Sequence, residues 1–127
     1  YRRLVKMLPN SNRGKTKRLR EVDKTSTRDY SHEQEVRVAE ILGGKVVVNS
    51  GATPFKKGDV ETDSWLIECK TTMSVKESMS VKAEWLRGIK EEAIGMRKKH
   101  SAVVISMDME HDYVVLPIDE FVKLLEE

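Results

Sequence analysis

Residues 58–70, GDVETDSWLIECK, restrict the possible folds of this chain more than any other segment. Turn-forming residues at 62–63 separate two stretches that have the residue pattern of β-strands, so the segment predicts a β-hairpin. Period-two geometry places Glu68 and Lys70 on the same face of the second strand as Leu66. An acid and a base therefore project side by side from a strand whose other residues are suited to burial.

The remaining chain alternates between helical and extended patterns. Apolar residues at 86, 89, 93 and 96 have helical spacing, and the basic residues that follow them suit the end of a helix. The expected elements are a helix at 31–42, strands at 45–49, 58–61 and 64–71, a helix at 80–100, strands at 102–107 and 113–117, and a helix at 118–127. This order predicts an α/β fold with a mixed β-sheet flanked by helices.

The length and composition of the chain favour one globular domain. A chain of 127 residues, 39% of them hydrophobic, can enclose one core but not two ordinary domains. Its apolar stretches are far shorter than a membrane span, and its single cysteine, Cys69, is typical of a reducing compartment. We therefore expect a cytoplasmic protein without a membrane anchor.

Positive charge is concentrated in residues 1–30, which we expect to form a basic arm ahead of a domain at 31–127. The arm holds ten Lys or Arg and three acids, whereas the domain holds thirteen basic and eighteen acidic residues. Such an arm could replace the counterions of DNA, and a disordered solubilising tail is the alternative. The candidate DNA-binding residues of the arm are Arg13, Lys15, Lys17, Arg18 and Arg20.

Three acids and one lysine form the candidate catalytic site. Asp59 and Glu68 lie on adjacent strands of the predicted hairpin, where two carboxylates repel unless a cation lies between them. Mg²⁺ prefers such oxygen ligands and leaves room for a substrate phosphate. Lys70 could position a water molecule or stabilise developing charge. The alternative is an exposed ion pair between Glu68 and Lys70, worth less than about 1 kcal/mol.

Glu35 is the third acid. It lies on the same helical face as Ala39 and Leu42, where an unpaired carboxylate would be costly to bury. A metal facing that side of the helix would remove the cost, so we expect Glu35 to join Asp59 and Glu68 as a metal ligand.

Other residues have two open interpretations. Lys82, at the start of the second helical stripe, could contact DNA or extend its ammonium into solvent. Lys56 and Lys57 precede the hairpin and could likewise contact the DNA backbone or be solvated. Trp85 could stack on a base, although packing is favoured. The histidines lie at the ends of the expected elements without zinc-binding spacing, so we expect them to be solvated.

These motifs resemble the PD-(D/E)XK nuclease superfamily, and within it the small Holliday-junction resolvase-like endonucleases of phages and archaea. EVRVAEILGG resembles the first helix of the family, NSGATPFKKGDV the loop into the catalytic hairpin, IECK the E-x-K motif, and SVKAEWLRGIKEEA the helix behind it. The resemblance implies a restriction-endonuclease-like core with α-β-β-β-α-β topology. It also implies catalytic roles for Glu35, Asp59, Glu68 and Lys70, and a phosphate contact at Ser50.

By this resemblance, the chain is expected to be a Mg²⁺-dependent endodeoxyribonuclease, with Mn²⁺ as a substitute metal. Water would attack the phosphodiester in line and leave a 5′-phosphate and a 3′-hydroxyl. The resemblance makes branched DNA the favoured substrate. Cutting a four-way junction needs two active sites, which a two-fold homodimer would supply; the candidate interface residues of the dimer are Met73, Met79 and Trp85. The alternatives are a site-specific or single-strand nuclease on the same core, or a non-catalytic DNA-binding protein with a basic arm.

Overall fold

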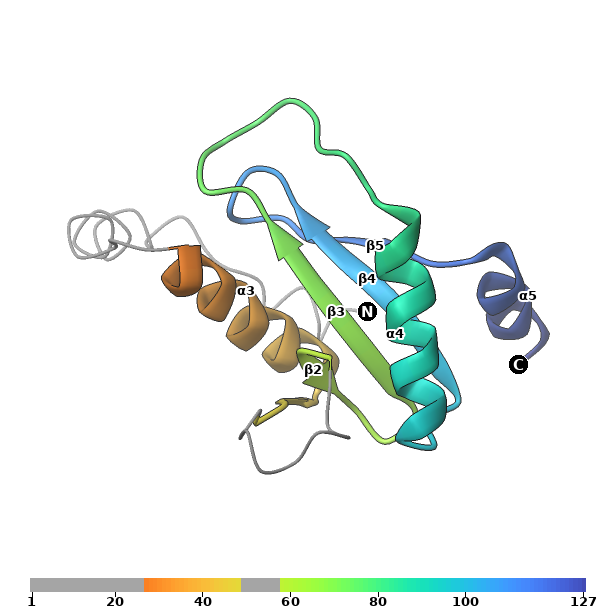
Figure 1. Ribbon diagram of the computed structural model, residues 1–127. Coiled ribbons are helices and arrows are strands. Elements are labelled where there is room, and N and C mark those ends of the chain that lie inside the picture. The colour runs from red at the N-terminus through yellow and green to blue at the C-terminus, as the bar shows by residue number, and fades with distance from the viewer. Residues whose placement is uncertain (1–26, 49–57) are drawn as a thin grey trace.

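The computed structural model describes residues 27–48 and 58–127 (Figure 1). The elements within these ranges are α3 (Thr27–Leu42), β1 (Lys45–Val46), β2 (Val60–Glu61), β3 (Trp65–Thr71), α4 (Ala83–Gly95), β4 (His100–Ser106), β5 (Tyr113–Val115) and α5 (Ile118–Glu126). Their order agrees with the predicted alternation of helices and strands. The predicted DNA-binding residues that lie outside the described ranges are Arg13, Lys15, Lys17, Arg18, Arg20, Ser50, Lys56 and Lys57.

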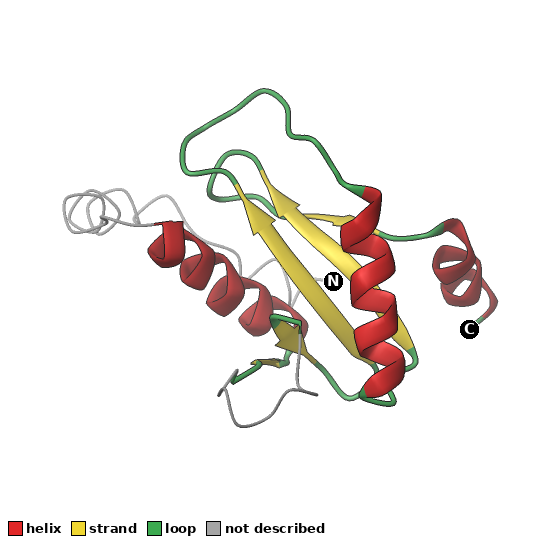
Figure 2. Cartoon of the chain, in the orientation of Figure 1, coloured by secondary structure: helices red, strands yellow, loops and turns green. Residues whose placement is uncertain are grey.

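The five strands form one mixed sheet in the order β1-β2-β3-β4-β5. The pairs β1–β2, β2–β3 and β4–β5 are antiparallel, and the long central strands β3 and β4 are parallel. A parallel pair needs a crossover connection, which α4 supplies. The sheet is thus the α/β arrangement expected from the sequence, with α3 and α4 flanking its long strands (Figure 2).

Two apolar clusters cover the two faces of the sheet. The cluster on the α3 side contains Val38, Ala39, Val60, Ile67, Cys69, Ala102 and Val104. The cluster on the α4 side contains Val47, Leu66, Ile89, Ala93, Val103 and Ile105. Alternate residues of β3 therefore enter opposite clusters, as its period-two pattern predicts, and Cys69 is a buried core residue.

The ends of the two long helices differ from the predicted boundaries. α3 begins at Thr27, four residues before the expected start, and a left-handed Gly43 (φ 67°) follows its end. α4 ends at Gly95, and Arg97 has a positive φ of 59°, so the basic residues up to 100 do not form the last turn. The amide of Lys98 instead donates to the carbonyl of Ala93, a bond that closes the helix end.

Helix α3 also turns a different face inward than the sequence suggested. Its buried residues are Gln34, Val38 and Ala39, whereas Leu42 is exposed. The face runs through Gln34 and Val38 because these residues meet β3 and β4, so Glu35 lies at its edge rather than at its centre.

Helix α5 lies beyond α4 (Figure 1) and contacts the start of β4 through His100. Its apolar side chains are exposed: Ile118, Phe121, Val122, Leu124 and Leu125. Its buried residue is Glu120, whose Oε2 lies 2.8 Å from Nδ1 of the buried His100. The expectation of a solvated histidine is therefore wrong at His100, because the ring also stacks on Trp65 with a centroid separation of 4.5 Å.

Two of the three residues considered for a dimer interface pack inside the domain. Met79 and Trp85 lie against the apolar cluster on the α4 side, and both are partly buried. Met73 is exposed in the loop that extends beyond the ends of β3 and β4 (Figure 1).

No helix within 27–48 and 58–127 is both long enough and apolar enough to cross a membrane.

Candidate active site

Asp59 is fixed against β3 by both its backbone and its side chain. Its amide donates to the carbonyl of Ile67 at 2.8 Å, and its carbonyl accepts from Val47 at 2.9 Å. Its Oδ2 accepts a hydrogen bond from the amide of Cys69, also at 2.8 Å. The acid on one side of the hairpin is therefore held at the backbone that joins Glu68 to Lys70.

Gly58 permits this position of Asp59. Its φ is 79°, in the left-handed region that favours glycine, and a Cβ there would lie 2.8 Å from side-chain atoms of Leu66. The glycine thus lets the chain pass over a core leucine and turn directly into Asp59. This local requirement explains why the sequence reads GDV at the entry to β2.

Glu68 is half-buried, and its carboxyl interacts electrostatically with that of Asp59. Burial raises the pKa of Glu68 to about 8, and the negative charge of Asp59 acts in the same direction. Two carboxyl groups this close share a proton more readily than they carry two charges. A divalent cation can take the place of that proton.

Lys70 supplies the positive charge of the site. Its Nζ lies 3.6 Å from Oε2 of Glu68 and 5.0 Å from the centre of the Trp85 ring. The positive charge opposes the rise in the pKa of Glu68 without cancelling it. The predicted pairing of Glu68 and Lys70 on one face of the strand is therefore present, on the side that faces α4.

Glu35 approaches the same group of charges from α3. Burial raises the pKa of Glu35, the negative charge of Asp59 raises it further, and His32 lowers it. The carboxyl of Glu35 is thus close enough to Asp59 for the two charges to interact. The structure brings three predicted acids from α3 and the hairpin into one electrostatic group.

Gln34, which sequence reasoning missed, anchors α3 to the active-site strand. Its Nε2 donates to the carbonyl of Lys70 at 3.0 Å and to the carbonyl of Val104 at 3.2 Å. The side chain is 1% exposed, and its Oε1 has no hydrogen-bond partner among the described residues. The available signal was a polar residue four positions before Val38, on a face that needs apolar groups.

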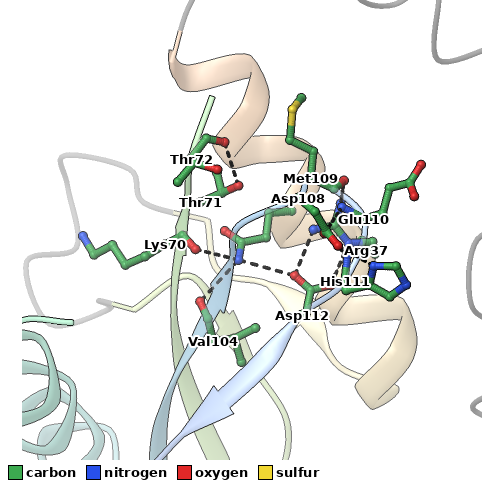
Figure 3. Close-up of polar contacts among 11 residues, drawn as sticks. Arg37, Lys70, Thr71, Thr72, Val104, Asp108, Met109, Glu110, His111 and Asp112 are labelled. Atoms are coloured by element: carbon green, nitrogen blue, oxygen red, sulfur yellow. Dashed lines mark hydrogen bonds and ion pairs between the residues drawn. The ribbon is translucent and has the colours of Figure 1, made fainter. Parts of the chain in front are cut away.

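Arg37 extends this connection to the turn between β4 and β5. Its Nε lies 2.7 Å from Oδ2 of Asp112, and its Nη2 lies 2.9 Å from Oδ1 of the same residue (Figure 3). Its Nη1 also donates to the carbonyl of Met109 at 3.2 Å. This bidentate pair is largely buried and fixes α3, and with it Glu35, relative to the sheet.

The hairpin acids are oxygen donors of the kind that Mg²⁺ prefers. Asp59 and Glu68 fit this ion, since it is usually bound by one or two carboxylates and retains several waters. Among residues 27–48 and 58–127, no group of three or more His, Cys, Asp or Glu has the arrangement of a metal site. Direct ligation by Glu35 alongside the two hairpin acids therefore stays a prediction.

Lys82 lies at the edge of this group. It is the exposed N-terminal neighbour of α4, and its Nζ is 6.0 Å from the centre of the Trp85 ring. The ring of Trp85 therefore has two ammonium groups near it.

Searches with protein-family models, among curated proteins and among solved structures found no match to this chain.

Proposed function

We propose that this chain is a Mg²⁺-dependent endodeoxyribonuclease with a restriction-endonuclease-like core. The observation that carries the proposal is the placement of Asp59, whose Oδ2 accepts from the amide between Glu68 and Lys70 at 2.8 Å, beside a Glu68 carboxyl that lies 3.6 Å from the Lys70 ammonium. An exposed ion pair does not account for this arrangement, because Glu68 is half-buried and lies against a second acid. A site for a divalent cation accounts for both features.

Each residue of the group has a separate task. Asp59 and Glu68 would hold the metal, and Mg²⁺, when bound, would neutralise charge on the phosphodiester and favour ionisation of water. The Lys70 ammonium would orient the attacking water or stabilise the charge that develops on the phosphate. Glu35, whose pKa is raised by burial, would accept or donate a hydrogen bond to water near the pair.

DNA is the proposed substrate, with branched DNA favoured. A two-fold homodimer would present two copies of the site to opposite strands of a four-way junction. This assembly is part of the proposal, and sedimentation of the purified protein at micromolar concentration would detect it. A monomer that cuts junction and linear duplex at equal rates would contradict the preference for branched DNA and leave a general nuclease.

The test of the proposed activity is a cleavage assay with Mg²⁺ and with a chelator. Labelled four-way junction, matched linear duplex and single strand would be digested side by side by the wild-type protein. We expect Asp59→Asn and Glu68→Gln to abolish cleavage and to retain DNA binding, because these acids hold the metal but repel phosphates. Asp63→Asn is the matched control, since Asp63 is an exposed acid in the same hairpin.

Three outcomes would contradict the proposal. Cleavage that continues at the wild-type rate in chelator would exclude a metal-dependent reaction. Near wild-type turnover by Asp59→Asn or Glu68→Gln, with Mg²⁺ present, would show that the active site lies elsewhere. DNA binding without cleavage by the wild-type protein would favour the non-catalytic alternative.

A further inference from the structure

Trp85 connects the proposed catalytic lysine to α4. It lies in the first turn of that helix, where its amide donates to the carbonyl of Lys82 at 3.0 Å. One side of the indole packs on the apolar cluster formed by α4 and the sheet. The ring centre lies 5.0 Å from the Nζ of Lys70 and 6.0 Å from that of Lys82. Trp85 is therefore fixed by packing and faces two cations.

The ion pair with Glu68 does not by itself fix the position of the Lys70 ammonium. Its nitrogen-to-oxygen distance of 3.6 Å exceeds the roughly 2.7–2.9 Å of a charge-assisted hydrogen bond. The lysine stem is also flexible, and the side chain is 33% exposed. A packed aromatic ring supplies the second restraint, since a cation within about 6 Å of a tryptophan centroid is attracted by the ring face.

We propose that Trp85 is a positioning residue that holds the ammonium of Lys70 beside Glu68. The role rests on the proposed nuclease function, because Lys70 is assigned there to the attacking water or the phosphate. Trp85 itself would take no part in proton transfer. Lys82 is exposed, with its Nζ 6.0 Å from the centre of the same ring, and would remain available to a phosphate of the substrate.

The first experiment separates turnover from substrate affinity. Trp85→Leu keeps an apolar side chain but removes the ring, and we expect kcat on the junction to fall by about tenfold, the scale of one cation–π contact. KM should change by less than about twofold, because the substrate-binding residues remain. Trp85→Phe retains an aromatic face and should keep most of the activity. Trp65→Phe, on the opposite face of β3, is the matched control.

Equal kcat for Trp85→Leu and the wild-type protein would overturn the proposal. A loss in Trp85→Phe as large as that in Trp85→Leu would also overturn it, since packing rather than the aromatic face would then be responsible. If Trp85→Leu fails to fold, the comparison of Trp85→Phe with the wild-type protein and the spectroscopic experiment below decide the matter.

The second experiment detects the contact without any need for cleavage. The chain has two tryptophans, so Trp65→Phe leaves Trp85 as the sole indole. In that background, Lys70→Met should shift the Trp85 fluorescence and its indole NMR signal. Lys90→Met, on the same helix but paired with Asp119, should leave both unchanged.

The two readouts distinguish the possible failures. An indole signal that is unchanged by Lys70→Met would overturn the positioning role of Trp85, whatever the activity of the protein. A shifted indole in a wild-type protein that cleaves no DNA would instead overturn the nuclease proposal and, with it, the catalytic meaning of the contact.

Discussion

Glu68 is subject to opposing influences that determine how the site responds to pH. Burial and Asp59 raise its pKa to about 8, and Lys70 lowers it. At neutral pH the metal-free pair therefore holds a proton. A metal that binds there must displace this proton, so its affinity should increase as pH rises toward 8.

The first prediction concerns the stability of the metal-free protein. The pKa of Glu68 is about 8 when folded and near 4.5 when exposed, so the folded state binds the extra proton between these values. The stability that this bound proton gives the folded state is therefore lost as pH rises from about 4.5 to about 8. Glu68→Gln should remove this part of the pH dependence. Urea unfolding in chelator at about pH 6 and about pH 8.5 would measure both proteins.

An identical pH dependence in the wild-type protein and Glu68→Gln would contradict this prediction. Added Mg²⁺ provides an internal check, since it should stabilise the wild-type protein more at the higher pH. Asp63→Asn should follow the wild-type curve, because Asp63 is exposed.

The candidate catalytic residues could be named individually from the sequence, but the contacts that hold their helix and strands together could not. The sequence pattern of 58–70 predicted the hairpin and the shared face of Glu68 and Lys70, because both depend on local geometry. Gln34 escaped notice because its partners, the carbonyls of Lys70 and Val104, lie 36 and 70 residues away. Such a polar anchor has no local signature, and only the packed fold defines it.

At the scale of the element, α5 is held by a polar contact. Glu120, its buried residue, lies against His100 at the start of β4, and Lys90 of α4 lies 3.7 Å from Asp119. The apolar residues of α5 face outward. The expected helix at 118–127 is present, but the sequence could not predict its inward side, since the apolar face of a helix usually packs on the core.

The second prediction is that the pair of His100 and Glu120 stabilises the fold. Glu120→Ala should lower the free energy of unfolding by about 2–3 kcal/mol, because it leaves a buried ring nitrogen without its partner. Glu127→Ala is the control, since Glu127 is exposed and its Oε1 lies 3.6 Å from the same ring; we expect less than about 0.5 kcal/mol. Denaturant unfolding at one pH measures both variants. Equal losses would show that the buried pair has no special role.

At the scale of the whole molecule, the order of elements and the mixed sheet followed from the sequence. The turn at 62–63 predicted the antiparallel pair of β2 and β3, and a helix between two apolar strands is the connection that the parallel pair of β3 and β4 requires. The positions of the helices on the sheet depended on long-range polar contacts, such as Arg37 with Asp112. The sequence does not reveal these pairs, because either residue alone is typical of a solvated surface.

The last prediction concerns the distribution of charge. Residues 31–127 hold five more acids than bases, and three of these acids lie in the proposed site, where a phosphate must approach. Affinity for DNA therefore has to come largely from the arm. Replacing Arg13, Lys15, Lys17, Arg18 and Arg20 together by Gln in the full chain should weaken binding to every DNA tested.

The salt dependence of binding identifies the cause of this loss. Each phosphate contact contributes about −0.9 to the slope of log affinity against log salt on duplex DNA. The variant with all five residues replaced should therefore have a clearly shallower slope. Its urea unfolding should match the wild-type protein, since we expect the arm to lie outside the folded domain at 31–127. Equal affinity and an equal slope would mean that the arm is a solubilising tail. The described domain would then have to attract DNA through its own lysines, against its net negative charge.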